Sequence, residues 1–429
     1  MVTNIVRKGA LELQEIFTSV ADESSMDPRH GTNVDCPDNI TDTTDRGNKV
    51  VIENGDDKEE ELVSLGGIEL SRSDRSLLLR SSGRYDDCDE IFSREQIMIK
   101  KYLLDNVPQF RTLLELRSKG WSNSEGDDYY KRQRHIADNA DERTTKVFMS
   151  MMRNVAHKMH EVTNVFNFEA TRPSILGLGF APGGKIETAL GVHSGVRVRG
   201  ITLPPTDGGI DVLIRRDLRH RLELDFADVT MMATDLGFSL SDIPADHPDA
   251  SKFLPRLIRP RQVFDLVTCE GGVMRTHQRA LYRERREAHR LRTAQLALAL
   301  ERVKVNGRMI VLMQHAESFN SVSLFYSFWK FAKVSLFKHH VAHQHRSSFY
   351  MIVRDIQSQS DEALRLVKQW KREWYISTFG SDEEYADLLQ STTLDVEVIL
   401  AEFGHEFAEL ATPIWEIQSM GLEKKSFVH

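Results

Sequence analysis

The sequence lacks the features that mark several common classes of protein. Its three cysteines, Cys36, Cys88 and Cys269, are scattered and form no CxxC pair, so neither a disulfide framework nor a structural zinc site is expected. No run approaches the roughly 18 apolar residues that span a bilayer, and the N-terminus leads into a polar segment rather than an apolar signal region. We therefore expect a cytoplasmic or nuclear protein without a membrane partner.

A strongly basic balance is also missing, because the formal net charge is −8. Any binding of nucleic acid would depend on a local patch rather than on the field of the whole protein. Two arginine-rich segments are candidates: Arg275–Arg292, with seven arginines and two glutamates in 18 residues, and Arg215–Arg221. A solvated helix face balanced by acidic residues elsewhere explains them equally well, and Tyr282 is the single interleaved residue among Phe, Tyr and Trp that could stack on a base.

Hydrophobic patterning divides the chain into four parts. Residues 1–90 are predicted to be a mostly disordered acidic tail with one short helix over 5–20, because little apolar surface is available for burial. Residues 91–170 and 358–429 carry apolar residues near the helical spacing of 3.6 and are predicted to be helical extensions. Residues 171–357 alternate β-rich runs with helices, which predicts an α/β domain with a mostly parallel sheet.

The most informative segment follows the first of six expected strands, which cover 174–178, 196–203, 221–227, 263–268, 307–313 and 348–353. That strand runs into a loop of small residues, Gly177–Gly184, and a helix is predicted from Lys185. Small residues let the backbone approach a ligand, and a helix N-terminus offers unpaired N–H groups, as at the cofactor loop of doubly wound sheets. Pro182 stands where a GxGxxG helix would begin, which argues against an NAD-linked enzyme; a tight turn without a ligand is the remaining alternative.

Four segments together resemble the FtsJ-like family of RNA ribose 2′-O-methyltransferases, in its fungal branch: Leu176–Gly184, Arg199–Pro204, Phe264–Gly272 and Gln295–Gly307. The resemblance implies a Rossmann-like methyltransferase sheet with flanking helices, S-adenosylmethionine as the cofactor and RNA as the partner. It also implies the cofactor-binding residues Gly177, Gly179, Phe180, Ala181, Pro182, Gly183, Gly184, Thr202, Asp228 and Glu270. Thr202 replaces the acid that often binds the ribose hydroxyls in this family, and Asp228 stands where the family contacts the adenine.

The resemblance further implies a catalytic Lys-Asp-Lys-Glu tetrad, of which this sequence keeps only part. The first lysine aligns with Lys158, with Ser150 in the competing register, and the aspartate aligns with Glu270. The second lysine falls on Leu312 and the final glutamate near Ser348. Because a lysine neutralised by its neighbours can serve as a base, its loss leaves His315 as a replacement candidate or as a histidine without a chemical role.

Two functions therefore remain open. The first is an S-adenosylmethionine-dependent methyltransferase, of the RNA 2′-O type by resemblance, with Lys158, Glu270 and His315 as candidate catalytic residues. The second is a catalytically inactive protein of the same fold that serves as a binding or scaffold module. No metal is expected, because the histidine-rich segment 339–345 has no cluster of carboxylates or cysteines beside it and is interpreted as a polar loop.

Overall fold

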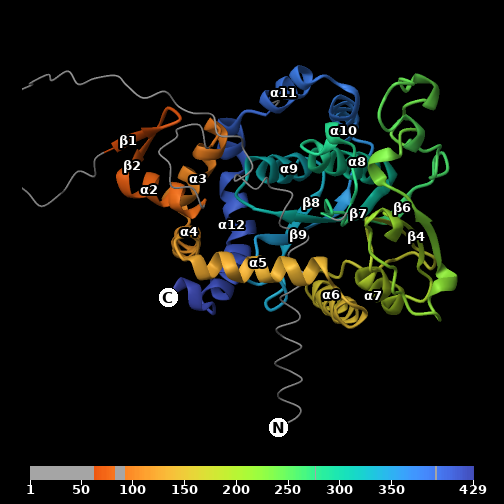
Figure 1. Ribbon diagram of the computed structural model, residues 1–429, viewed down its shortest axis with the longest axis horizontal. Coiled ribbons are helices and arrows are strands. Elements are labelled where there is room, and N and C mark those ends of the chain that lie inside the picture. Colours follow the sequence, from red (N-terminus) through yellow and green to blue (C-terminus); the bar gives the residue numbers. More distant parts are fainter. Residues whose placement is uncertain (1–61, 83–91, 276, 392–393) are drawn as a thin grey trace, which may run out of the picture.

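The centre of the computed structural model, which describes residues 62–82, 92–275, 277–391 and 394–429, is a seven-stranded sheet (Figure 1). The strand order is β5-β4-β3-β6-β7-β9-β8. β9 is antiparallel to β7 and β8, and the other neighbouring strands are parallel, so the expected mostly parallel α/β sheet is confirmed. The strands are β3 (Ser174–Leu178), β4 (Arg197–Thr202), β5 (Leu222–Phe226), β6 (Phe264–Cys269), β7 (Val303–Gln314), β8 (Lys333–Phe337) and β9 (Ser348–Ile356).

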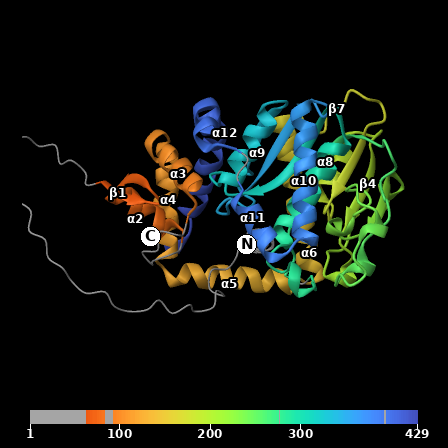
Figure 2. The ribbon, with the colours of Figure 1, turned by 90° about the horizontal axis from the view of Figure 1, so that it is seen from above.

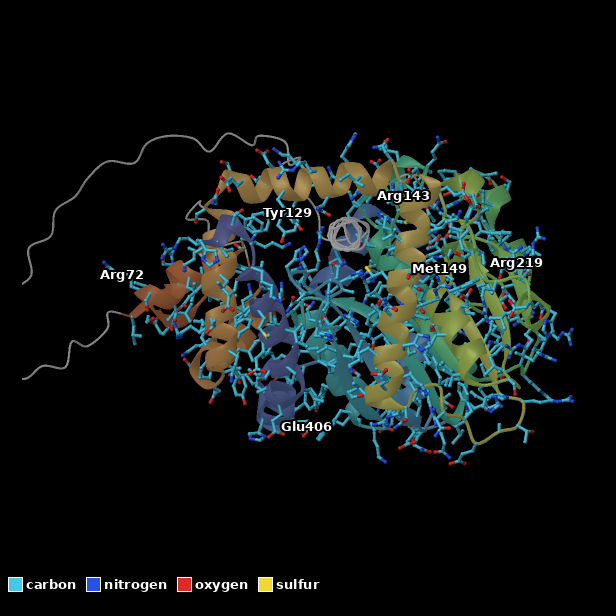
Figure 3. All side chains as sticks on the ribbon, turned by 90° about the horizontal axis from the view of Figure 1, so that it is seen from below. Arg72, Tyr129, Arg143, Met149, Arg219 and Glu406 are labelled. Carbon is cyan, nitrogen blue, oxygen red and sulfur yellow. The ribbon has the colours of Figure 1, made fainter. Side chains whose placement is uncertain are left out.

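Helices cover both faces of the sheet. Successive side chains of a strand point to opposite faces, and in β3 Ile175 belongs to one hydrophobic cluster while Leu176 and Leu178 belong to the other. The first cluster includes α6 (Glu142–Thr163) and α7 (Gly184–Val192); the second includes α8 (Glu287–Arg302), α9 (Phe319–Trp329) and α10 (Asp361–Phe379). Figures 2 and 3 view the molecule from opposite sides and show α10 and α6, respectively, in front of the sheet.

The two helical extensions pack against each other beside the α/β domain (Figure 1). Phe110 and Trp415, which are distant in sequence, meet with their ring centres 5.0 Å apart. The helices that pack together here are α3 (Arg94–Asn106) and α4 (Pro108–Trp121) of the first extension and α12 (Val396–Leu422) of the second. α5 (Ser124–Asp138) follows α4, and α11 (Asp382–Gln390) packs against α10.

The segment 62–82 departs from the predicted disordered tail. It forms a hairpin of β1 (Leu62–Leu65) and β2 (Ile68–Ser71), followed by α2 (Arg72–Ser81). Leu65, Leu70 and Leu78 are buried in the core shared with α3 and α4, so tertiary contacts order this segment. The helix predicted over 5–20 lies outside the described residues. Within those residues, no helix combines the length and apolar character that a bilayer crossing requires.

Candidate active site

The glycine loop between β3 and α7 crosses directly over the end of β6. Gly179 has φ of +63°, and a Cβ added there would lie 2.3 Å from Gly271 Cα, so only glycine fits. Its N–H donates to Ile201 O of β4 at 2.8 Å. The carboxyl ends of β3, β4 and β6 therefore converge at this loop, as expected for a ligand crevice in a parallel sheet.

Other residues of the loop have structural roles. Phe180 points into the sheet, where a Cβ on Gly200 would approach its ring to 2.3 Å. A Cβ on Gly184 would lie 2.6 Å from Met152 Cβ, so this glycine sets the close packing of α7 on α6. The carbonyl of Pro182 accepts from Leu213 N–H at 2.9 Å. These contacts fix the conformation of the loop against the sheet and α6.

A cavity of about 150 Å³ opens beside the loop. It brings together five residues predicted to bind the cofactor: Gly179, Ala181, Thr202, Asp228 and Glu270. Apolar side chains form most of its remaining wall, as in small-molecule sites generally. This volume lies below the roughly 300–1,000 Å³ typical of small-molecule sites.

Lys185 and Glu270 form a buried ion pair at one end of this cavity. Lys185 Nζ lies 2.5 Å from Glu270 Oε2 and 4.7 Å from the centre of the Tyr350 ring. The side chains of Lys185 and Glu270 are 2% and 6% exposed. Although burial opposes the charge, Glu270 and Tyr350 raise the pKa of Lys185, so the amine is a cation at neutral pH.

His343 reaches the same end of the cavity from the loop between β8 and β9. The buried ammonium of Lys338 fixes this loop by donating to the carbonyls of His343, Arg346 and Ser348 at 2.6–3.0 Å. Burial and nearby cations hold the pKa of His343 well below its usual range, so its imidazole is neutral. The histidine-rich segment predicted to be a polar loop thus lends one side chain to the cavity.

The opposite end of the cavity contains Asp228 in a network of charges. Asp228, His277 and Glu287 each place one potential metal ligand within 4.8 Å of the others. Two guanidinium groups already bind these carboxylates: Arg283 Nη2 lies 3.3 Å from Asp228 Oδ2, and Arg290 Nη1 lies 2.7 Å from Glu287 Oε2. Because these two guanidinium groups already balance the charge of the carboxylates, the geometry favours an ion-pair network that positions Asp228 over a metal site.

Two predicted catalytic residues lie away from this cavity. Lys158 is on an exposed face of α6 and pairs with Glu161 at 2.9 Å. His315 follows β7 and lines a larger cavity, of about 1240 Å³, between α3, α8, α9 and α10. Of the three candidates, only Glu270 lies in the wall of the cofactor cavity, where Leu312 occupies the position predicted for the second lysine.

The arginine-rich segment 275–292 is partly internal. Arg283, Arg286 and Arg290 are at most 5% exposed and bind carboxylates, a hydroxyl or backbone elsewhere in the chain, so they are not available to phosphates. Arg215, Arg216 and Arg219 of the other segment are exposed, and Figure 3 shows Arg219 at the outer edge of the α/β domain. The structure therefore removes Arg283, Arg286 and Arg290 from the predicted basic surface, whereas Arg285 of the same segment is exposed.

Comparison with known proteins identifies the fold family. Residues 152–356 match the model of the FtsJ-like methyltransferase family. The chain contains an FtsJ-like methyltransferase domain. This match confirms the membership of residues 152–356 in the FtsJ-like methyltransferase family and the methyltransferase fold predicted from sequence. It supports S-adenosylmethionine as the cofactor of the FtsJ-like domain.

Several solved structures are similar to the chain at low identity. They include an O-methyltransferase family protein from Burkholderia thailandensis (14% identity, 64% of this chain and 77% of that chain covered, TM-score 0.28). A second is a TehB-like SAM-dependent methyltransferase from Corynebacterium glutamicum (12% identity, 54% of this chain and 98% of that chain covered, TM-score 0.26). A third is an rRNA methylase from Streptococcus thermophilus (9% identity, 47% of this chain and 97% of that chain covered, TM-score 0.26). Among curated proteins, none matches the chain.

The cavity of the FtsJ-like domain fits S-adenosylmethionine in chemical character. Gly179 leaves a cradle that a Cβ would fill, and Asp228 and Thr202 supply oxygen atoms for the polar groups of a nucleoside. Lys185 was not predicted as a site residue. The only sequence signal for it is a lysine in the first turn of a helix whose following residues, Ile186–Leu190, are all buried.

Proposed function

We propose that the FtsJ-like domain transfers the methyl group of S-adenosylmethionine to a ribose 2′-hydroxyl of RNA. The observation that carries the proposal is the Lys185–Glu270 pair in the wall of the cofactor cavity. A bound S-adenosylmethionine supplies an electrophilic methyl group, and the protein's residues must then orient a nucleophile and handle its proton. A buried carboxylate beside an ammonium suits a hydroxyl nucleophile.

The exposed arginines 215, 216 and 219 support RNA as the source of that hydroxyl. They follow Gly209 and Ile210, which line the cavity, so a phosphate backbone bound there would pass close to its mouth. Phosphate neutralisation by such residues supplies affinity without requiring a particular sequence. The family resemblance points to the same acceptor.

Leu312 favours the second candidate, a cofactor-binding scaffold without activity. Its apolar side chain lines the cavity where the family resemblance places a lysine, and Lys158 lies on an exposed face of α6. The scaffold would bind S-adenosylmethionine but would transfer no methyl group.

Calorimetric titration with S-adenosylmethionine, followed by transfer of a tritiated methyl group to RNA, tests both candidates. We expect micromolar binding that is lost in Gly179→Arg, and label incorporated into RNA but not into DNA of the same sequence. Binding without incorporation would favour the scaffold. Absence of binding up to millimolar concentration would contradict both candidates.

A further inference from the structure

The Lys185 end of the cavity contains buried polar atoms that the fold leaves unsatisfied. Glu270 Oε1 and His343 Nε2 are inaccessible to water and have no hydrogen-bond partner among the described residues. A buried polar atom without a hydrogen-bond partner carries a desolvation penalty. In Glu270, Oε2 is paired with Lys185, but this pair does not relieve the penalty on Oε1. Both residues line the cavity, so a group bound there could satisfy these atoms.

The Lys185–Glu270 pair is difficult to explain as a stabilising feature. Replacing a buried ion pair with apolar residues of similar size is often neutral or stabilising. Three residues that follow Lys185 in α7, Ile186, Ala189 and Leu190, belong to a buried apolar cluster. An ion pair that stability does not require, with one free oxygen beside a cofactor cavity, points to a ligand.

We propose that Lys185 and Glu270 form the acceptor subsite, which holds the hydroxyl group to be methylated. Glu270 Oε1 accepts the hydrogen bond of the hydroxyl, and the Lys185 ammonium stabilises the negative charge that develops on its oxygen. This inference rests on the proposed function and adds the residues that recognise the acceptor. Lys185 would thereby supply, from α7, the cation that Leu312 cannot supply from β7.

The transfer balances with these groups alone. The acceptor oxygen forms a bond to the methyl carbon while the carbon–sulfur bond of the donor breaks, and that electron pair stays on sulfur. The hydroxyl proton passes to Glu270 Oε1, which leaves Glu270 as a neutral carboxylic acid. Lys185 keeps its proton throughout, which makes it an electrostatic group rather than the base.

The test compares a fluorescent single-stranded oligoribonucleotide with its 2′-deoxy counterpart. Fluorescence anisotropy with S-adenosylhomocysteine present gives the ratio of their affinities for the wild type, Lys185→Met and Glu270→Gln. We expect the wild type to prefer RNA by about tenfold, as for a hydrogen bond to a charged group, and each variant to bring the ratio close to one. Lys333→Met, which removes an exposed lysine paired with Asp355 at 2.8 Å, is the matched control and should keep the wild-type ratio.

The Lys185→Met/Glu270→Gln double variant guards against misfolding, because it leaves no unpaired buried charge. Thermal unfolding identifies the folded variants, and the ratio of affinities is compared among those. A preference for RNA that survives in the double variant would overturn the inference. A wild type that binds both oligonucleotides equally would overturn the subsite alone, whereas one that binds neither would remove RNA as the acceptor and the subsite with it.

Discussion

Buried lysines in this protein are accommodated in three different ways. Lys185 has a carboxylate partner, and Lys338 donates to three carbonyls of its own loop. Lys100 has neither kind of partner among the described residues: its ammonium lies 3.7 Å from the centre of the Phe92 ring, in the wall of the larger cavity. Burial lowers the pKa of Lys100 to about 8.

Lys100 should therefore destabilise the fold in a pH-dependent way. Below pH 8 the charge is present in both the folded and the unfolded states, and the penalty is complete; it disappears as the pH rises towards the unfolded value of 10.5. Lys100→Met should raise the free energy of unfolding near pH 6.5 by up to about 3 kcal/mol, and this gain should fall by about half at pH 9.5. Urea denaturation at both pH values measures the difference; a gain that does not change with pH would contradict the lowered pKa.

At the scale of elements, α7 links the cofactor loop to the rest of the domain. It has only nine residues, and seven of them, Gly184–Leu190, are buried. Glu187 accepts from Arg153 of α6 at 2.8 Å and from the backbone N–H of Arg215 at 2.9 Å. Any displacement of α7 would therefore move Lys185, the loop and the basic segment together.

Two glycines of α7 provide a direct test of this coupling. Gly184→Ala places a methyl group against α6 and should cost about 1–3 kcal/mol of stability, with weaker S-adenosylmethionine binding as α7 shifts. Gly191→Ala is the matched control, because a Cβ there meets no atom within 4 Å; it should be neutral or stabilising by up to about 1 kcal/mol. Thermal unfolding and calorimetry measure both effects, and equal behaviour of the two variants would argue against tight α6–α7 packing.

Much of the sheet could be predicted from sequence because its strands are short, apolar and separated by turn residues. All six expected strands are present, with ends that shift by a few residues. β8 was missed because it lies at the edge of the sheet and only Phe337 in it is fully buried. Lys185 was missed for another reason. A strand-by-strand comparison looks for the second lysine of the tetrad at Leu312 in β7, whereas Lys185, the proposed counterpart of that lysine, lies in α7.

At the scale of the whole molecule, Glu317 joins the α/β domain to both helical extensions. Its carboxylate lies 2.6 Å from Arg117 Nη1 of α4 and 3.4 Å from Trp415 Nε1 of α12. Although burial opposes ionisation, Arg117 and His315 hold the pKa of Glu317 well below its usual range. The ionised form therefore stabilises the contact between the three parts of the chain.

Glu317→Gln should loosen this junction. It leaves the buried charge of Arg117 without a carboxylate, although Arg117 Nη2 still donates to Gln418 Oε1 at 2.9 Å; breaking a buried ion pair typically costs about 3–5 kcal/mol. Because the pKa of Glu317 is lowered in the folded state, its contribution is present above the ordinary glutamate range and is lost as the pH falls below it. Wild-type stability should thus decline on acidification more steeply than that of the variant, and parallel acid profiles from chemical denaturation would contradict this role.

The two arginine-rich segments should respond differently to mutation. Replacing Arg215, Arg216 and Arg219 with alanine should weaken RNA binding and reduce the slope of log affinity against log salt by about two, with little change in stability. Arg283→Ala should instead lower the melting temperature, because Asp228, Asp249 and Glu287 lose their shared cation. Anisotropy at several salt concentrations and thermal unfolding separate the two classes; an unchanged salt slope in the triple variant would rule out this surface.

The contact between α4 and α12 also bears on how the chain is made. Phe110 of α4 packs on Trp415 of α12, and the whole α/β domain is translated between them. At ordinary rates of synthesis this interval lasts on the order of tens of seconds, during which the apolar face of α4 has no partner from α12. During synthesis α4 therefore waits for its partner α12. Until α12 emerges from the ribosome, the apolar face of α4 must be shielded by the hairpin and α2 or by a chaperone.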